Sequence, residues 1–344
     1  MRLFKFALAG AFSLATTFAC AAGFRFIGVP ADASGPALKG AIWYPCATPS
    51  GEVKLTDTLS IRGVVDCPVD GSRLPLVVIS TGGNGGFANN YDTAEALADA
   101  GYLTAAISHP GFTSPDKMIL KQNVLDLIER PTETKRLVDY LLGAWPDASK
   151  INPERIGFFG FSRGADTGLV AIGGNPDFRR GVALSMCPQD LKIVCDKVWM
   201  TATSIPAHDP RIKAAVLADP AFAVLFGPDS LKAVTVPIQL WASAYGGERT
   251  TPEDVAVLEN ELPAKPDYRV VPNSIHYAFL PPCSPDQQRS KRPQCVDAPG
   301  FDRADTARSD GSNTADRANK ADGTAAAGPH ADRNAERAGS AGGR

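Results

Sequence analysis

The sequence lacks the local ligand patterns by which most proteins hold a zinc ion. Its 344 residues include 4 histidines and 7 cysteines, and no Cys-x-x-Cys or His-x-x-x-His spacing occurs among them. Structural zinc sites and metal-dependent hydrolases usually draw two ligands from such a local pair. We therefore expect no metal site.

The sequence also lacks a charge imbalance. Lys and Arg together number 35 and Asp and Glu 37, which gives a formal net charge of −2. No basic block interleaved with aromatic residues is present, so we do not expect nucleic acid as a partner. Beyond the first 22 residues no apolar stretch is long enough to cross a bilayer, so we expect no stable membrane span.

The amino terminus has the features of a secretory signal peptide over residues 1–22. A basic start at Arg2 and Lys5 precedes an apolar run over residues 6–19, and small residues follow it. Cys20 raises the alternative of a lipoprotein anchor, but the residues just before it lack the usual Leu, which disfavours lipidation. We expect a secreted or periplasmic protein.

The carboxyl terminus lacks apolar residues. After Phe301 the chain contains no Leu, Ile, Val or aromatic residue, and residues 303–344 consist mainly of Ala, Asp, Arg, Gly, Ser, Asn and Thr. Such a segment cannot bury enough apolar surface to offset chain entropy. We expect a disordered tail over 303–344 and one folded domain over 23–302.

Six cysteines remain after the signal peptide, an even number that suggests disulfides in an exported chain. They fall into three couples that are local in the sequence and lie on expected loops. Neighbour pairing is the simplest scheme, and it gives the disulfides Cys46–Cys67, Cys187–Cys195 and Cys283–Cys295.

Buried strands alternate with helical patterns along the domain. Continuous apolar runs at 74–80, 103–107 and 155–159 are typical of strands buried on both faces. Further strands are expected at 24–28, 38–44, 181–184, 213–218, 237–242 and 268–271, and helices at 91–100, 131–142, 163–172 and 252–262. This alternation predicts an α/β fold with a mostly parallel sheet covered on both faces.

The segment Gly160-Phe161-Ser162-Arg163-Gly164 is a Gly-x-Ser-x-Gly motif between an expected strand and an expected helix. A sharp strand-to-helix turn would hold the Ser162 hydroxyl at the carboxyl edge of the sheet, and the flanking glycines would allow the backbones to approach. Ser162 is therefore our candidate nucleophile.

A serine hydroxyl needs a base, and His276 is the best placed of the four histidines. It follows the last expected strand and a turn, downstream of the serine. His109 lies upstream and is better interpreted as a loop or packing residue. The oxyanion of a tetrahedral intermediate needs backbone N–H donors, for which we select Arg163, directly after the nucleophile, and Gly83 in the glycine-rich loop after strand 74–80.

Three blocks of the sequence carry a family resemblance: LVVISTGGNGG…ALADAGYLTAAISHPG, RIGFFGFSRGADTGL and VPNSIHYAFLPPCSP. Between about Gly23 and Phe301 the chain resembles bacterial dienelactone-hydrolase-like proteins, which are related to platelet-activating-factor acetylhydrolases and more distantly to cutinase-like polyesterases. The resemblance implies an α/β-hydrolase fold, a carboxylic-ester substrate that is a small molecule or lipid-like, and no metal or organic cofactor.

The acid of a Ser–His–acid triad should lie between Ser162 and His276, at the end of a strand. Two positions qualify. Asp219 ends strand 213–218, the place that the acetylhydrolase relatives use. Glu248 follows strand 237–242 in a turn that resembles the family's Gly-Asp-x-x-x-Pro, and we prefer Glu248.

These residues predict a serine hydrolase that cleaves carboxylic esters through an acyl-enzyme. A serine peptidase on the same fold differs only in its substrate and stays open as an alternative. A non-catalytic exported binding protein is a third hypothesis. The undecided acid, the unusual Arg163, and Thr81 at a position where relatives commonly have His motivate it.

Overall fold

The computed structural model describes residues 21–56, 59–83, 85–110, 119–183, 192–201, 207–248, 250–289 and 292–303. Residues 1–20, which hold most of the expected signal peptide and the lipidation candidate Cys20, lie outside these ranges, as does the expected tail after Arg303. Within the described ranges, no helix has the length and apolarity that a bilayer crossing requires.

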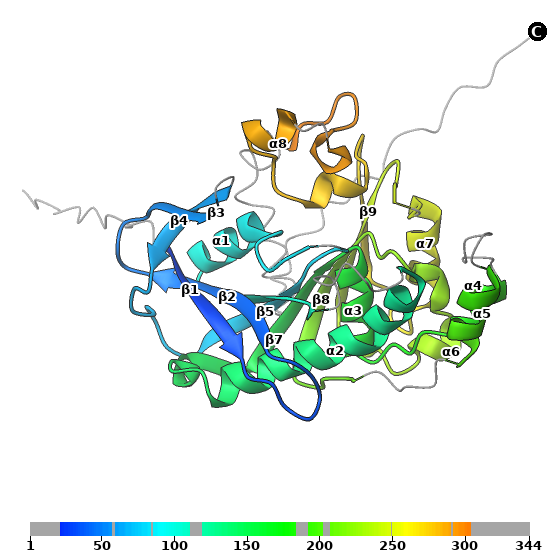
Figure 1. The fold of residues 1–344 in the computed structure, drawn as a ribbon, viewed down its shortest axis with the longest axis horizontal. Helices are drawn as coiled ribbons and strands as arrows, with labels where there is room; N and C mark the ends of the chain where they lie inside the picture. Colours follow the sequence, from blue (N-terminus) through cyan, green and yellow to red (C-terminus); the bar gives the residue numbers. More distant parts are fainter. Residues whose placement is uncertain are drawn as a thin grey trace, which may run out of the picture.

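A 10-stranded sheet runs through the molecule in the order β10-β9-β8-β7-β5-β6-β2-β1-β4-β3 (Figure 1). The strands are β1 Ala21–Val29, β2 Leu38–Cys46, β3 Gly51–Thr56, β4 Leu59–Val65, β5 Leu74–Ser80, β6 Leu103–Ser108, β7 Ile151–Phe161, β8 Ile212–Ala218, β9 Ile238–Ser243 and β10 Asp267–Val271. The six strands from β10 to β6 pair in parallel, whereas β2 pairs antiparallel with both β6 and β1. The expected mostly parallel sheet is confirmed.

The centre of the sheet is buried on both faces because β5 and the second half of β7, residues 156–161, consist almost entirely of apolar residues and glycine. Val77 and Ile79 of β5 belong to one apolar cluster, whereas Leu76 and Val78 belong to the other. This alternation follows from the two-residue period of a strand. Neither face can be left in water, so helices must cover both.

The helices are α1 Tyr91–Asp99, α2 Ile119–Gly143, α3 Arg163–Ala171, α4 Phe178–Ala183, α5 Lys192–Thr201, α6 Pro228–Leu231, α7 Pro252–Glu261 and α8 Pro285–Arg289. Helix α1 packs its apolar side into the cluster of Val77 and Ile79. Helices α2, α3 and α7 pack into the opposite cluster, with α2 lying along α3 (Figure 1). The helical layers on both faces confirm the expected architecture.

The structure corrects the sequence analysis at three places. Residues 181–183, expected to begin a strand, belong to α4, because a short apolar run fits a buried helix as well as a strand. Helix α2 begins at Ile119 and continues through Pro131, which was expected to start it. The hairpin of β3 and β4 was not expected, because its alternating polar residues give only a weak apolar signal.

Two of the three expected disulfides, Cys46–Cys67 and Cys283–Cys295, are present. The first joins the end of β2 to the segment after β4, and the second closes a loop near the carboxyl end of the described chain. Cys187 is not among the described residues, so the third pair stays a prediction.

Candidate active site

Ser162 lies in a sharp turn between β7 and α3. Its backbone has φ 55° and ψ −124°, a left-handed value that costs a non-glycine residue about 1 to 3 kcal/mol. Its N–H donates to the carbonyl of Ala218 at 2.9 Å, which fixes the turn against the end of β8. The strained turn projects the hydroxyl from the carboxyl edge of the sheet, beside the first turn of α3.

The two glycines of the motif are required for close approach. A Cβ on Gly160 would overlap the carbonyl of Gly164, and a Cβ on Gly164 would overlap the carbonyl oxygen of Ser80 in β5. The serine turn therefore packs directly onto the neighbouring strand. Any side chain at either position would displace Ser162.

His276 begins the short 3₁₀ helix His276–Phe279 after β10. Its backbone N–H donates to the Gly246 carbonyl at 2.8 Å, and its Nε2 lies 2.9 Å from Ser162 Oγ. The imidazole lies against the ring of Phe161, with 4.8 Å between the ring centroids. Ser162 is 7% exposed and His276 2%, so this hydrogen bond is shielded from bulk water.

Asp219 completes a hydrogen-bonded chain with this histidine. His276 Nδ1 lies 3.1 Å from Asp219 Oδ2. Ser243, at the end of β9, also binds the carboxylate, through its N–H to Oδ1 at 2.8 Å and its hydroxyl to Oδ2 at 2.5 Å. Ser162, His276 and Asp219 are called the elbow relay below, because Ser162 lies in the sharp turn, or elbow, between β7 and α3.

The expectation that Glu248 binds the imidazole does not hold in this geometry. The Glu248 carboxylate instead accepts a hydrogen bond from the Tyr277 hydroxyl at 2.5 Å, on the surface. Partial burial, and then Glu248, raise the pKa of Tyr277. The sheet order explains why Asp219 meets this histidine. Strand β8 is the direct neighbour of β7, and Ala218 pairs with Phe161, so the next residues, Asp219 and Ser162, emerge side by side.

The loop after β5 reaches the serine turn through Gly82 and Gly83. A Cβ on Gly82 would lie 3.4 Å from Ser162 Cβ, and a Cβ on Gly83 would lie 3.1 Å from Arg163 Nε. Within the described parts of the chain, the N–H groups of Gly82 and Gly83 donate to no acceptor. The structure thus places Gly82 against Ser162, and Gly83 against the side chain of Arg163, the residue that follows Ser162.

A buried group of charged side chains lies beneath this loop. Arg130 donates to the carbonyls of Thr81 at 2.9 Å and Gly82 at 3.4 Å. Asp126, one helical turn earlier in α2, lies 3.8 Å from Arg130 Nε and binds Arg163 at 2.6 Å. Burial lowers the pKa of Arg130 to about 10, although Asp126 opposes the shift, so the guanidinium is charged at neutral pH. The sequence analysis missed this group.

A second Ser–His–carboxylate chain adjoins the same loop. His109 Nε2 lies 3.1 Å from Ser80 Oγ, and His109 Nδ1 lies 2.5 Å from Glu133 Oε2. Burial, reinforced by the charge of Arg130, lowers the pKa of His109 to about 4, so the imidazole is neutral at pH 7. These three residues are called the strand relay below, because Ser80 belongs to β5. The burial of His109 agrees with its interpretation as a loop or packing residue.

Asp166 in α3 connects the serine helix to the segment after Asp219. Its carboxylate accepts the N–H groups of Ala221 and Phe222, both at 3.1 Å. Full burial raises the pKa of Asp166 to about 7 in spite of these bonds. The only sequence signal for this contact was a carboxylate in the first turn of a small-residue helix.

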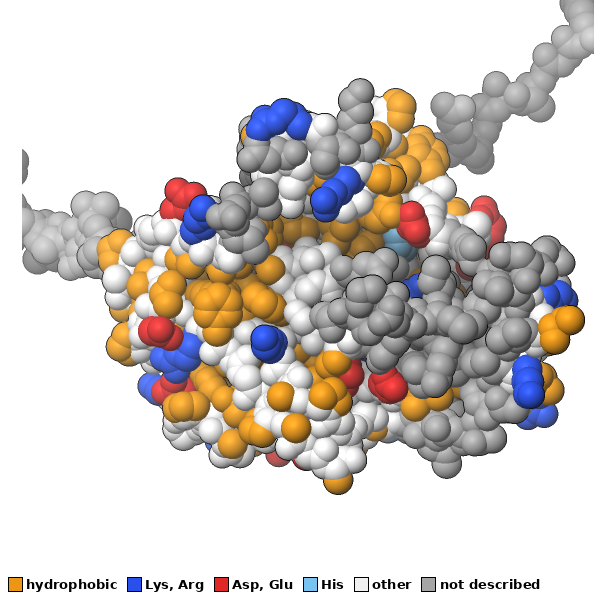
Figure 2. Space-filling model, in the orientation of Figure 1, with side chains coloured by type: hydrophobic (Ala, Val, Ile, Leu, Met, Phe, Trp, Pro, Cys, Tyr) orange, Lys and Arg blue, Asp and Glu red, His pale blue; other side chains and the backbone are white. Residues whose placement is uncertain are grey.

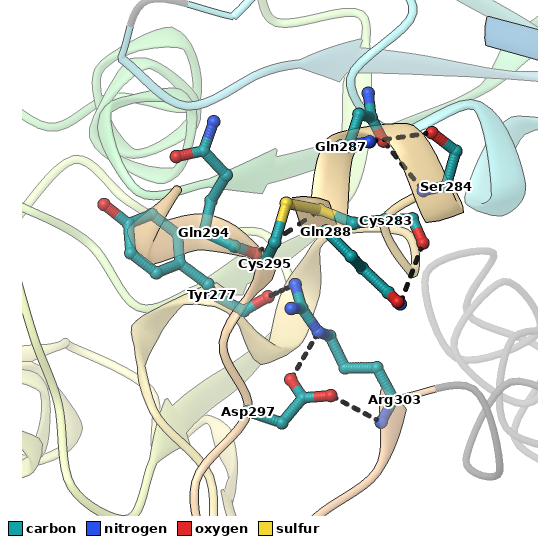
Figure 3. Close-up of a disulfide and its surroundings, with 9 residues drawn as sticks. All are labelled: Tyr277, Cys283, Ser284, Gln287, Gln288, Gln294, Cys295, Asp297 and Arg303. Carbon is teal, nitrogen blue, oxygen red and sulfur yellow. Dashed lines mark hydrogen bonds and ion pairs between the residues drawn. A yellow bond between two sulfur atoms is a disulfide. The ribbon is translucent and has the colours of Figure 1, made fainter. Parts of the chain in front are cut away.

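The segment after His276 folds over the carboxyl edge of the sheet as a cap, defined here as residues 280–289 and 292–303. Figure 3 shows the disulfide Cys283–Cys295 at its centre and Arg303 at its end. Arg303 donates to the Tyr277 carbonyl at 2.9 Å and pairs with Asp297 at 2.6 Å. Arg303, the first residue assigned to the tail, is buried here.

The space beneath the cap is lined by apolar side chains. Figure 2 shows a hollow under this overhanging segment, with hydrophobic side chains along its floor and a histidine at one edge. Phe279 packs beside Phe161, with ring centroids 5.9 Å apart. Among the described residues, no three metal-ligating side chains cluster together.

Solved structures with a similar backbone include a ferulic acid esterase from Streptomyces cinnamoneus, at a TM-score of 0.58 and 16% identity, over 89% of this chain and 92% of that chain. Two structures of a cold-adapted esterase from an Arctic intertidal metagenomic library match at TM-scores of 0.44 and 0.43, with 17% and 16% identity, over 74% of this chain and 86% and 85% of theirs. No protein-family model and no curated protein matches the sequence.

The sheet order, the helices on both faces and the first of these likenesses define the α/β-hydrolase fold. At this level of identity the likeness extends to the fold alone.

Proposed function

We propose that this protein is a serine hydrolase that cleaves carboxylic esters through an acyl-enzyme, with the elbow relay as its catalytic triad. The observation that carries the proposal is the chain of hydrogen bonds from Ser162 Oγ through His276 to Asp219. Ester cleavage agrees with the resemblance to dienelactone-hydrolase-like and acetylhydrolase-like proteins. It also agrees with the presence of a ferulic acid esterase among the structures of similar fold.

In the proposed mechanism His276 Nε2 takes the Ser162 proton as the hydroxyl oxygen attacks the ester carbonyl carbon. The imidazolium then donates that proton to the departing alkoxide, which leaves as the alcohol. Water, deprotonated by the same nitrogen, cleaves the acyl-enzyme, and the proton returns to Ser162 as the acid leaves. Asp219 holds the Nδ1–H tautomer and stabilises the imidazolium.

The amides of Gly83 and Arg163 would stabilise the oxyanion in both halves of the reaction. Gly82 and Gly83 carry no side chain, so a substrate carbonyl can approach their N–H groups without steric hindrance. The apolar floor of the hollow favours an ester with an apolar acyl or alcohol group, either a small molecule or lipid-like. The two disulfides agree with a secreted or periplasmic location.

A fluorophosphonate probe and a series of nitrophenyl esters test the proposal directly. The probe should phosphonylate Ser162, as located by peptide mass spectrometry, and the protein should hydrolyse the esters at a rate that depends on acyl length. The Ser162→Ala variant should neither react nor hydrolyse. A folded wild-type protein that does neither would be a binding protein, and one that cleaves amides far faster than esters would be a peptidase.

A further inference from the structure

Arg130 binds two successive carbonyls of the loop that faces the nucleophile. Its Nη1 donates to Thr81 O at 2.9 Å and its Nη2 to Gly82 O at 3.4 Å. In a trans peptide unit the C=O and the N–H point in opposite directions. When Arg130 holds these carbonyls, the N–H groups of Gly82 and Gly83 are therefore turned away from Arg130.

We propose that Arg130 is the positioning residue of the oxyanion hole, and that its guanidinium orients the N–H groups of Gly82 and Gly83 for the tetrahedral intermediate. This inference rests on the proposed serine-esterase function. Arg130 touches neither the substrate nor the reacting atoms, and it acts through the loop backbone.

The loop needs such an external support because its own hydrogen bonds hold its peptide planes only in part. Gly82 and Gly83 are adjacent glycines, which have the widest choice of backbone conformation of all residues. The bonds internal to the loop run from Thr81 Oγ1 to Gly85 O at 3.2 Å and from Gly85 N to Gly82 O at 3.3 Å. The second bond shares the Gly82 carbonyl with Arg130, whereas neither bond holds the peptide unit that carries the Gly82 N–H. That unit is held by the 2.9 Å bond from Arg130 to the Thr81 carbonyl.

The chemistry of the site requires an arginine. A planar guanidinium presents parallel donors that can bind two neighbouring carbonyls at once, whereas an ammonium group is a point donor. The side chain is 1% exposed, so its charge must be compensated within the protein. Asp126 provides that charge and also binds Arg163, whose backbone N–H is the other proposed oxyanion donor.

The proposal predicts a loss in turnover more than in substrate binding. Loss of one oxyanion donor generally lowers kcat by about 10²- to 10³-fold. We expect Arg130→Gln to lower kcat by about 100-fold with less than about a threefold change in KM, and Arg130→Lys to lower it by about 10-fold. Asp126 keeps its 2.6 Å ion pair with Arg163 in both variants, so it is not left as an isolated buried charge.

Arg136 offers a matched control on the same helix. It is also buried, and it also binds a carbonyl, that of Pro30 at 2.7 Å, together with the carboxylate of Asp32 at 2.8 Å. These partners belong to the turn after β1, away from the nucleophile. Arg136→Gln should lower thermal stability about as much as Arg130→Gln does, and it should leave kcat within about threefold of the wild type.

The deciding measurement is the inhibition constant of an alkyl trifluoromethyl ketone in the full-length protein. The ketone adds to a catalytic serine and forms a stable oxyanion, so its affinity reports the state of the oxyanion hole. Active sites are counted by fluorophosphonate titration, so that misfolded molecules do not contribute. In Arg130→Gln the inhibition constant should rise by about the same factor as kcat falls, with Arg130→Lys in between.

Two results would overturn the inference. One is an inhibition constant in the Arg130 variants equal to that of the wild type. The other is a rise of the inhibition constant in Arg136→Gln as large as the rise in Arg130→Gln. If Arg130→Gln does not fold, Arg130→Lys decides alone, and a wild-type inhibition constant there rejects the positioning role. A wild-type protein in which Ser162 fails to react with the probe would reject the proposed function itself, a distinct outcome.

Discussion

The elbow relay and the strand relay have the same hydrogen-bond pattern in two different backbone settings. In each, a serine hydroxyl lies against Nε2 of a histidine whose Nδ1 lies against a carboxylate. Ser162 occupies a strained turn at the edge of the sheet, whereas Ser80 is the last residue of a regular strand. Ser162 is 7% exposed and Ser80 1%.

If Ser162 is the nucleophile, as we propose, a Ser–His–carboxylate chain does not by itself make one. The hydroxyl must also leave the plane of the sheet, and amide donors must lie where the oxyanion forms. Under the proposed function Ser162 meets both conditions, because it lies in a turn with positive φ and the Gly82–Gly83 loop packs against that turn. Ser80 meets neither, because α3 packs over it through Gly164, whose α-carbon lies against the Ser80 carbonyl. The strand relay instead joins the end of β5 to the residue after β6 and to α2.

Replacing each serine in turn tests this comparison with the largest expected effect. Ser162→Ala should lower kcat for a nitrophenyl ester by on the order of a millionfold, because the nucleophile is lost. Ser80→Ala removes one buried hydrogen bond and should lower kcat by less than about tenfold. Comparable losses in the two variants, measured on protein with wild-type thermal unfolding, would show that both relays take part in catalysis.

The acid of the elbow relay is tested by a second pair of variants. Asp219→Asn should lower kcat by about four orders of magnitude, because the amide favours the wrong imidazole tautomer. Glu248→Gln should stay within about threefold of the wild type, because its carboxylate binds the Tyr277 hydroxyl on the surface. The reverse ranking in a side-by-side assay would transfer the role of the acid to Glu248.

The two disulfides should separate stability from activity. Each closes a loop, with sequence separations of 21 and 12 residues, so replacing either pair by serines should lower the free energy of unfolding by about 3 kcal/mol. Removing Cys283–Cys295 should also lower kcat/KM, because that loop belongs to the cap that follows His276. An equally large loss of kcat/KM in the variant that lacks Cys46–Cys67 would show that the effect on activity is not specific to the cap.

The strand relay should make stability depend on pH. The pKa of His109 is lowered to about 4 in the folded state, below its value of about 6.5 in the unfolded chain. The unfolded chain therefore binds more protons between these values, so the contribution is complete above about pH 6.5 and is lost as the pH falls towards 4. The loss is on the order of 2 to 3 kcal/mol.

Urea unfolding at about pH 7.5 and about pH 4.5 measures this contribution. His109→Asn should unfold with a smaller difference between the two pH values than the wild type, because every other titrating group is common to both proteins. Equal differences would show that His109 does not titrate in this window, and the assigned neutral state would be wrong.

The candidate nucleophile and base could be selected from the sequence because their signals are local. The run 155–159 ends in a glycine motif, and the motif's two glycines are the positions where a Cβ would collide with a neighbouring backbone. His276 follows the last strand within a few residues. Expectations of this kind depend on contacts between near neighbours in the chain, which a sequence pattern records directly.

The candidate acid could not be chosen in this way, because Asp219 and Glu248 both follow an expected strand. The backbone does not separate them either, since both have positive φ in the structure. The choice depended on which strand lies next to β7, and this order has no local signature. Arg130 was missed for a related reason. The residue before Pro131 looked like the position before a helix, whereas packing against α3 carries α2 through the proline.

The sequence by itself determined the alternation of buried strands and helices, the serine turn and the position of the histidine, because apolar periodicity and glycine sterics act over a few residues. Only the tertiary structure decided which carboxylate meets His276, which of two serine relays includes the turn at the edge of the sheet, and which arginine holds the loop of Gly82 and Gly83. Each of these depends on residues distant in sequence that the sheet order and the docking of α2 bring together.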